Sequence, residues 1–391
     1  MRDMSATVRQ MAAGTPPERD RYVDFLRGVS ILAVVAGHWT IATIQRGPHG
    51  IEVGNVLSQV PALRPVTWVF QVMGVFFVVG GFSTRRTIEG RATFDRGAFF
   101  ASRAERLLRP TVAFVLVWLV AALALQGVGV DDGLTHAIAR IAAQPLWFLA
   151  VYLLVTLIAP AQLALHRRAP VVLVVALAVM VLLVTVGPYP VSMVGLPGAR
   201  VSNMSPPTVC ILLLTIVHTG LLTAFRPAGR RLLQRPRVWT ATVAANAGIM
   251  TIFLWHLTAA AAVGAVFYAM DLLPVPGSVD WWLLKIPWFV GCLVVLAVVV
   301  AATVGIERLP AWSDGQRGHA WVRAIGVLLA VRGFAGFALT GFDHPLTARG
   351  QSFLGFTLSP AVDIALVVAG YALACWFPAR RDRGRGFGWV R

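Results

Sequence analysis

The sequence predicts an all-α, polytopic integral membrane bundle of about ten transmembrane helices with both termini in the cytoplasm. Composition is the first reason: 57% of the 391 residues are hydrophobic, 13% are charged, and the mean hydropathy is +0.73. A soluble domain usually carries about 25% charged residues. The apolar residues also gather in continuous runs rather than alternating, which favours helices over a membrane barrel. The third reason is the placement of the basic residues between those runs.

Ten apolar segments are long enough to cross a bilayer, which requires roughly 17–25 residues of helix. The seventh is long enough to tilt or to extend past the bilayer, and the ninth contains Arg332. The expected spans are residues 28–45, 66–83, 111–127, 146–165, 170–187, 208–225, 242–268, 281–304, 321–341 and 360–377.

The basic residues set the orientation. With a cytoplasmic N-terminus, 27 of the 34 Lys and Arg residues fall on the cytoplasmic side of these spans and six on the other. Such a bias follows the positive-inside rule. It also accounts for the net charge of +17 without nucleic acid as a partner.

The chain is expected to divide into three parts. These are a polar cytoplasmic N-terminal tail at residues 1–20, a transmembrane domain at 21–378 and a basic cytoplasmic C-terminal tail at 379–391. The three cysteines are isolated within apolar runs, so they indicate neither a disulfide framework nor a metal site. We expect no metal and no permanently bound cofactor.

Ionisable side chains inside the hydrocarbon are costly and by default indicate function. Arg27 and His38 are eleven residues apart, which is three helical turns, and lie within about 20° of one face, with Asp24 near the same face. His38 lies roughly 15 Å deep, where a neutral imidazole is suited to act as a general base. The alternative is a histidine that only hydrogen-bonds a neighbouring helix.

Further polar residues follow the second span. Arginine guanidinium groups bind phosphates in bidentate fashion, so Arg85, Arg86, Arg103 and Arg106 are candidates for an anionic donor. The alternative is ordinary positive-inside anchoring.

Two later aromatic segments carry candidate supporting residues. Trp147 begins the fourth span and suits either a site or an interfacial aromatic belt. His256, in the outer half of the seventh span, suits either an acceptor-side role or a structural hydrogen bond. Arg332 is expected to pair with Asp363 of the last span.

Taken in order, these segments resemble the membrane acyltransferase 3 family of bacterial O-acyltransferases. The resemblance rests on the opening Asp24-Phe-Leu-Arg27-Gly28 with His38 ten residues on, and on four later segments. Those segments are Phe-Phe-x-x-x-Gly-Phe at 76–82, the arginine-rich stretch at 103–110, Leu-Trp-Phe-Leu at 146–149 and the Trp-His pair at 255–256. Gly80 departs from the family, many members of which have Ser before the Gly-Phe, and this puts in doubt a hydroxyl role there.

The resemblance implies a multi-pass enzyme of the bacterial cytoplasmic membrane. It implies acyl-coenzyme A as the cytoplasmic donor of an acetyl or other short acyl group. The acceptor is a hydroxyl on a glycan, a lipid-linked saccharide or a secreted metabolite. His38 would be the catalytic histidine, with Arg27 and the arginines at 85, 86, 103 and 106 binding the donor. Direct transfer with His38 as base and transfer through an acylated His38 both stay open.

The main alternative from another class is a secondary transporter or flippase with His and Arg at the midplane. Transporters commonly contain internal repeats and helices broken at matching positions. The ten segments have no such correspondence, which favours the enzyme. A haem protein would need paired histidines such as His38 and His256, and nothing else in the sequence supports one.

Overall fold

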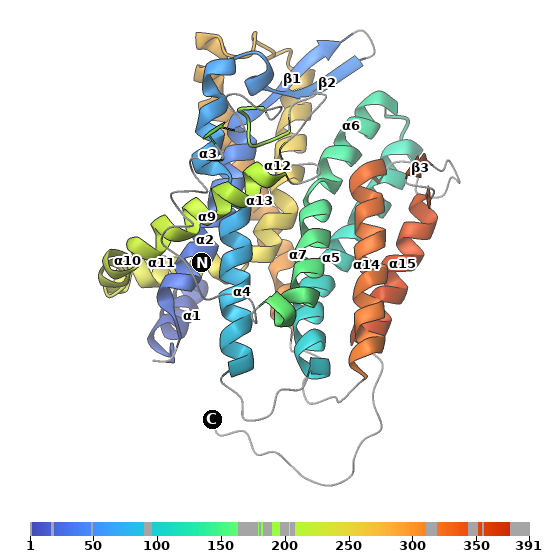
Figure 1. The fold of residues 1–391 in the computed structure, drawn as a ribbon. Helices are drawn as coiled ribbons and strands as arrows, with labels where there is room; N and C mark the ends of the chain where they lie inside the picture. Colours follow the sequence, from blue (N-terminus) through green and yellow to red (C-terminus); the bar gives the residue numbers. More distant parts are fainter. Residues whose placement is uncertain are drawn as a thin grey trace. The chain divides into compact units, whose positions relative to one another are not determined.

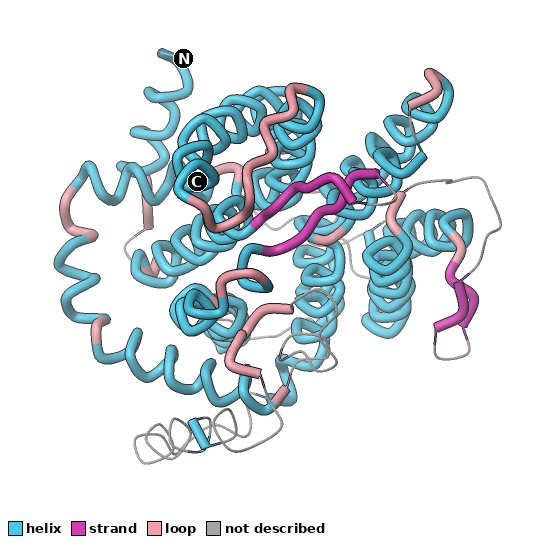
Figure 2. The backbone as a smooth tube through the Cα atoms, turned by 90° about the horizontal axis from the view of Figure 1, so that it is seen from above, coloured by secondary structure: helices cyan, strands magenta, loops and turns pink. Residues whose placement is uncertain are grey.

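A computed structural model of the chain is predominantly helical, with two short antiparallel hairpins (Figures 1 and 2). This confirms the predicted all-α polytopic fold class. The residues that the structure describes are 2–16, 19–47, 50–89, 96–130, 132–162, 179, 181–182, 190–195, 203, 208–309, 319–342, 351–353 and 356–375.

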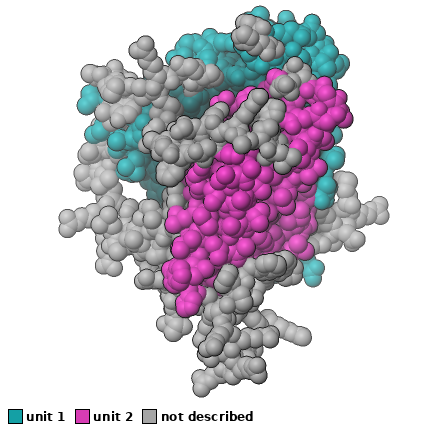
Figure 3. All heavy atoms as spheres, turned by 90° about the vertical axis from the view of Figure 1, so that its right-hand side faces the viewer, with its two compact units in different colours: residues 1–87, 158–302 teal, residues 88–157, 303–391 magenta. Residues whose placement is uncertain are grey.

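The chain divides into two compact units, each formed by two separate stretches of sequence. Unit 1 comprises residues 1–87 and 158–302, and unit 2 comprises residues 88–157 and 303–391 (Figure 3).

Unit 1 contains the two helices that carry His38 and His256. Its elements are α1 (Arg2–Ala13), α2 (Arg21–Ile41), β1 (Ala42–Gly47), β2 (Gly50–Asn55), η1 (Val56–Ser58), η2 (Pro61–Val66), α3 (Thr67–Phe70), α4 (Met73–Glu89), α9 (Val209–Ala224), α10 (Arg226–Leu232), α11 (Pro236–Asn246), α12 (Ile249–Ala269) and α13 (Val279–Arg308), of which α4 and α13 end in unit 2.

Unit 2 is built mainly of long apolar helices. Its elements are α5 (Arg96–Gly127), α6 (Asp132–Ala143), α7 (Pro145–Gln162, which ends in unit 1), α14 (Ala320–Thr340), β3 (Gln351–Phe353), β4 (Phe356–Leu358) and α15 (Pro360–Cys375).

The ends of α2 are defined by local chemistry. The Asp20 carboxylate accepts hydrogen bonds from the backbone N–H groups of Tyr22 and Val23, which is the usual way that an Asp begins a helix. At the other end Ala42 adopts an extended conformation and donates its N–H to the His38 carbonyl. Strand β1 starts there and pairs antiparallel with β2. The helix therefore ends four residues before the predicted span, which was expected to reach residue 45.

Among the residues that the structure describes, six helical stretches are apolar and long enough to cross a membrane, and a seventh counts if α9 and α10, bent by 55°, form one span. They are Pro61–Ser83, Ala101–Gly127, Gly133–Leu153, Ile249–Ala269, Val279–Glu307 and Ala320–Thr340. The chain is thus a multi-pass membrane protein. The prediction of ten spans, and with it the cytoplasmic side of both termini, stays a prediction.

Two of the predicted spans differ from the structure for identifiable reasons. Helix α2 is not among the apolar six because Arg21, Asp24 and Arg27 occupy its first turns. The expected span 242–268 is interrupted between α11 and α12 at Ala247–Gly248, so its spanning part begins at Ile249. The span expected at 170–187 lies almost wholly outside the described residues.

Burial distinguishes the helices of unit 1. Helix α12 is the most enclosed of the six apolar stretches, with 72% of its most apolar window buried, whereas α13 has 17%. Helix α13 therefore exposes most of its surface, which suits contact with lipid. Helix α12, which carries His256, is an interior helix.

In unit 2, helices α14 and α15 pack with their backbones in contact. A Cβ atom on Gly370 would lie 2.6 Å from both the Ala330 nitrogen and the Gly326 oxygen. Small residues allow this approach in membrane helices. Beside them Arg332 donates to Asp363 at 2.8 Å, which confirms the predicted pair.

We expect Gly370→Ala to destabilise unit 2, on the order of 2 kcal/mol, because the added methyl group would overlap two backbone atoms. Gly305→Ala is the matched control, since a Cβ there meets nothing within 4 Å and Ala is the better helix former. Thermal unfolding of both variants in detergent measures the difference. Equal melting temperatures would show that the α14–α15 contact is looser than described.

Candidate functional site

The two candidate histidines, 218 residues apart in sequence, are in direct contact. His38 Nδ1 of α2 lies 2.8 Å from His256 Nε2 of α12. The ring planes are nearly parallel, at 13° to each other, and the ring centroids are 5.1 Å apart, as expected for two rings that meet edge to edge through a hydrogen bond. His256 is fully buried, whereas His38 is half-buried. The structure thus joins two residues that the sequence could propose only separately.

The hydrogen bonds define which nitrogen of each neutral ring carries the proton. His256 Nδ1 lies 2.6 Å from the Phe253 carbonyl oxygen, which can only accept, so His256 Nδ1 must be the donor. Its Nε2 is then an acceptor and receives the proton of His38 Nδ1. This leaves His38 Nε2 with a lone pair.

A second set of hydrogen bonds fixes the helix end that carries His38. The Trp39 indole donates to the His256 carbonyl at 2.9 Å. Lys285 Nζ donates to the carbonyls of Trp39, at 3.0 Å, and Ala42, at 2.8 Å, and the Trp288 indole donates to Trp39 as well. These are carbonyls at the C-terminal end of α2, where donors and positive charge are favourable. Helices α2, α12 and α13 are therefore connected around the histidine pair.

Sequence reasoning missed Lys285, which it counted only among the basic residues of the outer side. Its ammonium lies 4.3 Å from the ring centre of Trp281 and 4.8 Å from that of Trp288. The available signal was that the only lysine of the chain lies inside an apolar run, between tryptophans four residues before and three residues after it. One helical face therefore carries all three.

At the other end of α2, the predicted residues Asp24 and Arg27 form an ion pair. Arg27 Nη1 lies 3.2 Å from Asp24 Oδ1, and Arg19 donates to the second oxygen of the same buried carboxylate. Asn246 of α11 donates to the Asp24 backbone carbonyl at 2.9 Å. Arg27 is half-buried, so an anionic ligand that bound it would share it with Asp24.

Asp20, one turn before, anchors α10 to the start of α2 through Arg226 and Arg230. Burial acts to raise the pKa of the Asp20 carboxyl, but the hydrogen bond and the charge of Arg226, with smaller contributions from Val23 and Arg230, bring it below its usual 3.8. The ionised carboxylate therefore stabilises the fold at any pH above 3.8, and this contribution is lost as the pH falls through 3.8 and then through the lower folded value.

We expect Asp20→Asn to lower the stability of the protein by about 1 kcal/mol, since Asn retains the helix cap but loses the charge. The difference from the parent protein should be the same at pH 8 and pH 6 and should shrink only near pH 4 and below. Thermal unfolding of both proteins at the three pH values measures it. A difference that already changes between pH 8 and pH 6 would contradict the lowered pKa.

The other predicted site residues are placed as follows. The side chains of Arg85 and Arg86, near the end of α4, lie outside the described residues. In unit 2, Arg106 is exposed on α5 and Arg103 is half-buried. Trp147 is half-buried at the start of α7, edge-to-face with Phe148. In the part of the chain that the structure describes, no group of three or more His, Cys, Asp or Glu residues could hold a metal ion.

Comparison with known proteins agrees with the resemblance seen in the sequence. The chain matches the family Acyl_transf_3, described as an acyltransferase domain, over residues 20–326, which includes both histidines. The comparison with curated proteins gave no match, and neither did the comparison with solved structures. The family match covers well over half of the chain. The protein therefore belongs to the Acyl_transf_3 family and is a multi-pass membrane acyltransferase that transfers groups other than amino-acyl groups.

Proposed function

We propose that the protein transfers a short acyl group, such as acetyl, from acyl-coenzyme A on the cytoplasmic side of the bacterial cytoplasmic membrane to an acceptor hydroxyl. The observation that carries the proposal is the contact of 2.8 Å between His38 and His256. In this proposal His256 orients the His38 ring and its base nitrogen Nε2, as the Asp of a Ser-His-Asp triad orients the catalytic histidine.

The chemistry follows from the proton positions. The acceptor O–H bond breaks as its proton passes to His38 Nε2, and the oxygen forms a bond to the thioester carbonyl carbon. The tetrahedral intermediate then collapses, the C–S bond breaks, and the coenzyme thiolate takes the proton from His38. Throughout, His38 Nδ1–H stays bonded to His256, which stabilises the imidazolium that forms transiently.

Assaying purified protein in lipid nanodiscs with acetyl-coenzyme A tests the proposal. Release of the free coenzyme thiol reports donor use, with water or an added alcohol as the acceptor. Mass spectrometry of surface glycans and exported metabolites from cells with and without the gene then identifies the natural acceptor. A protein that releases no coenzyme with any acceptor present would contradict the choice of donor.

Donor binding is assigned to arginines of the sequence around residues 85–109. Coenzyme A carries several phosphate charges, and the sequence of this segment contains seven arginines and only three acidic residues, Glu89, Asp95 and Glu105. Glu105 is paired with Arg109, and Arg106 of the same helix is exposed. Exposed guanidinium groups are suited to bidentate contact with phosphate.

We expect replacement of both Arg103 and Arg106 by Gln to raise the KM for acetyl-coenzyme A by about tenfold, because two charged hydrogen-bond donors are removed. The value of kcat should change little. Arg140→Gln is the matched control, since it removes an exposed arginine on α6 that the positive-inside pattern assigns to the opposite side. If both variants have the same KM as the parent protein, the two arginines are membrane anchors only.

A further inference from the structure

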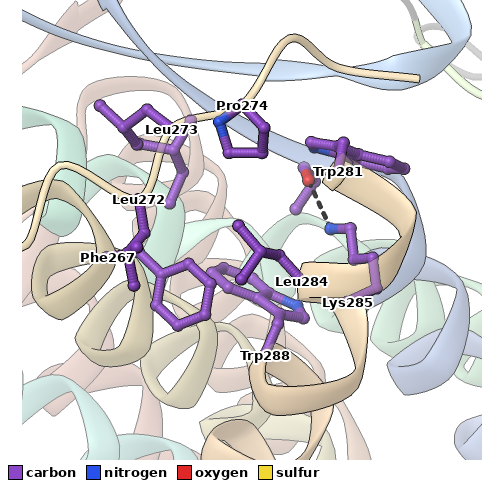
Figure 4. A pocket seen from close by; sticks show the side chains of 10 residues that line it. Phe267, Leu272, Leu273, Pro274, Trp281, Leu284, Lys285 and Trp288 are labelled. Atoms are coloured by element: carbon purple, nitrogen blue, oxygen red, sulfur yellow. Dashed lines mark hydrogen bonds between the residues drawn. The ribbon is translucent and has the colours of Figure 1, made fainter. Parts of the chain in front are cut away.

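Unit 1 contains a pocket beyond the end of α2, at the side remote from Asp20 (Figure 4). It is open on one side, and its empty space is about 360 Å³ when the solvent at its mouth is included. Its walls come from β1, the end of α12, the segment that follows α12 and the first three turns of α13. Most of the lining is aromatic or aliphatic: Phe267, Leu272, Leu273, Pro274, Trp281, Leu284 and Trp288.

Lys285 is the one charged side chain among the described residues that line the pocket, and none of the others carries a hydroxyl, an amide or a carboxylate. Its ammonium has three N–H donors. Two of them bond to the carbonyls of Trp39 and Ala42, the second drawn as a dashed line in Figure 4. One N–H donor is therefore left for a ligand, and the positive charge is stabilised by two indole faces.

The pocket is connected to the histidine pair through the backbone. Ala42 lines the pocket and donates its N–H to the His38 carbonyl, one helical turn or about 6 Å back along α2. Trp288, another wall, donates to the Trp39 carbonyl, and the Trp39 indole donates to His256. A molecule held here would lie at the end of the helix that carries the proposed base.

We propose, on the basis of the proposed function, that this pocket binds the acceptor and that the acceptor is a predominantly apolar alcohol. Its hydrocarbon part lies against the tryptophans, and an oxygen of the molecule accepts the remaining N–H of Lys285. A free sugar does not fit this lining, because most of its hydroxyl groups would lose water without gaining a partner. Among hydroxyl acceptors, the pocket selects an exported small molecule over a polar glycan.

Fluorine NMR of the protein in nanodiscs tests the pocket with two ring compounds of similar size. The probes are 4-fluorobenzyl alcohol, which has one hydroxyl, and 4-deoxy-4-fluoroglucose, which has several. The fluorine signal of the alcohol is expected to broaden in the presence of the protein, and this broadening should saturate as the alcohol concentration rises. The signal of the sugar should not broaden in this way. Leu284→Trp, which fills the pocket, should weaken alcohol binding by about tenfold or more. Leu283→Trp is the matched control, because the neighbouring Leu283 is 59% exposed; it should bind like the parent protein.

The role of Lys285 is tested by comparing 4-fluorobenzyl alcohol with 4-fluorotoluene, which lacks the oxygen. The parent protein and Lys285→Arg should bind the alcohol about fivefold more tightly than 4-fluorotoluene. Lys285→Met should bind the two compounds with equal affinity. A preference that survives in Lys285→Met would remove Lys285 from the site. Because this readout is a ratio of two ligands on one protein, partial loss of folded material does not imitate it.

The same probe separates this proposal from the proposed function. Formation of 4-fluorobenzyl acetate from acetyl-coenzyme A reports transfer, whereas broadening reports binding. Binding that persists in His38→Ala without ester formation supports both. Binding by the parent protein with no ester formed would contradict the function and leave the pocket standing. Ester formation unaffected by Leu284→Trp, or saturable binding of the sugar at equal affinity, would overturn the pocket.

Discussion

His38→Ala is expected to reduce acyl transfer by about 10³-fold or more while the protein still inserts and folds. The variant removes the nitrogen that takes the acceptor proton, and general base catalysis alone contributes roughly 10²–10⁴-fold. Loss of the ordered tautomer and of the positioned lone pair adds to this. Coenzyme release from acetyl-coenzyme A in nanodiscs measures the effect, with the melting temperature recorded on the same sample.

Leu32→Ala provides the matched control for this variant. It shortens a side chain to the same methyl group on the same helix, but Leu32 is 47% exposed and lies away from the hydrogen-bonded pair. Its activity should stay within about twofold of the parent protein, as expected for an exposed position. Normal transfer by His38→Ala, with Leu32→Ala equally active, would exclude His38 as the base.

His256→Ala is expected to lower kcat by about 10²-fold and to leave the KM for the donor nearly unchanged. The deletion leaves the His38 Nδ1–H without its acceptor at 2.8 Å, so the ring can rotate or exchange its proton to Nε2. The orientation of the base is then lost but its chemistry is not. Initial rates over a range of acetyl-coenzyme A concentrations separate the two constants.

Two further variants decide whether His256 acts through His38. In His256→Gln the side-chain oxygen can take the position of Nε2 as an acceptor, so this variant should recover to within about tenfold of the parent kcat. The double variant lacking both histidines should be no slower than His38→Ala alone, because residues that act as a unit are not additive. Additive losses in the double variant would assign His256 an independent role.

Much of the fold was predictable because the bilayer imposes strong constraints on sequence. Long apolar runs such as 281–304 can be satisfied only by helices, whose backbone groups bond within the segment. Where the hydropathy pattern was ambiguous, the observed helix ends differ from the predicted ends. The run 242–268 contains a helix break at Gly248 that an average over hydropathy does not detect. Arg332 and Asp363 were predicted as partners because an ion in hydrocarbon needs one, and they are 2.8 Å apart.

The sequence alone also determined the class of the protein and singled out the residue that we propose as its catalytic base. Periodicity placed Arg27 and His38 on one face of a helix, and the order of motifs indicated the acyltransferase family that the comparison then confirmed. Periodicity gives the direction of a side chain around its own helix axis. It does not give the identity of the helix that lies opposite.

Only the tertiary structure decided the partners. The contact of His38 with His256 joins positions 218 residues apart, and the contact of Lys285 with Trp39 joins positions 246 apart. Such contacts depend on how helices rotate and cross, which many residues determine together. They give His38, the proposed base, a partner that defines the position of its proton, and they place Lys285 in the wall of a pocket.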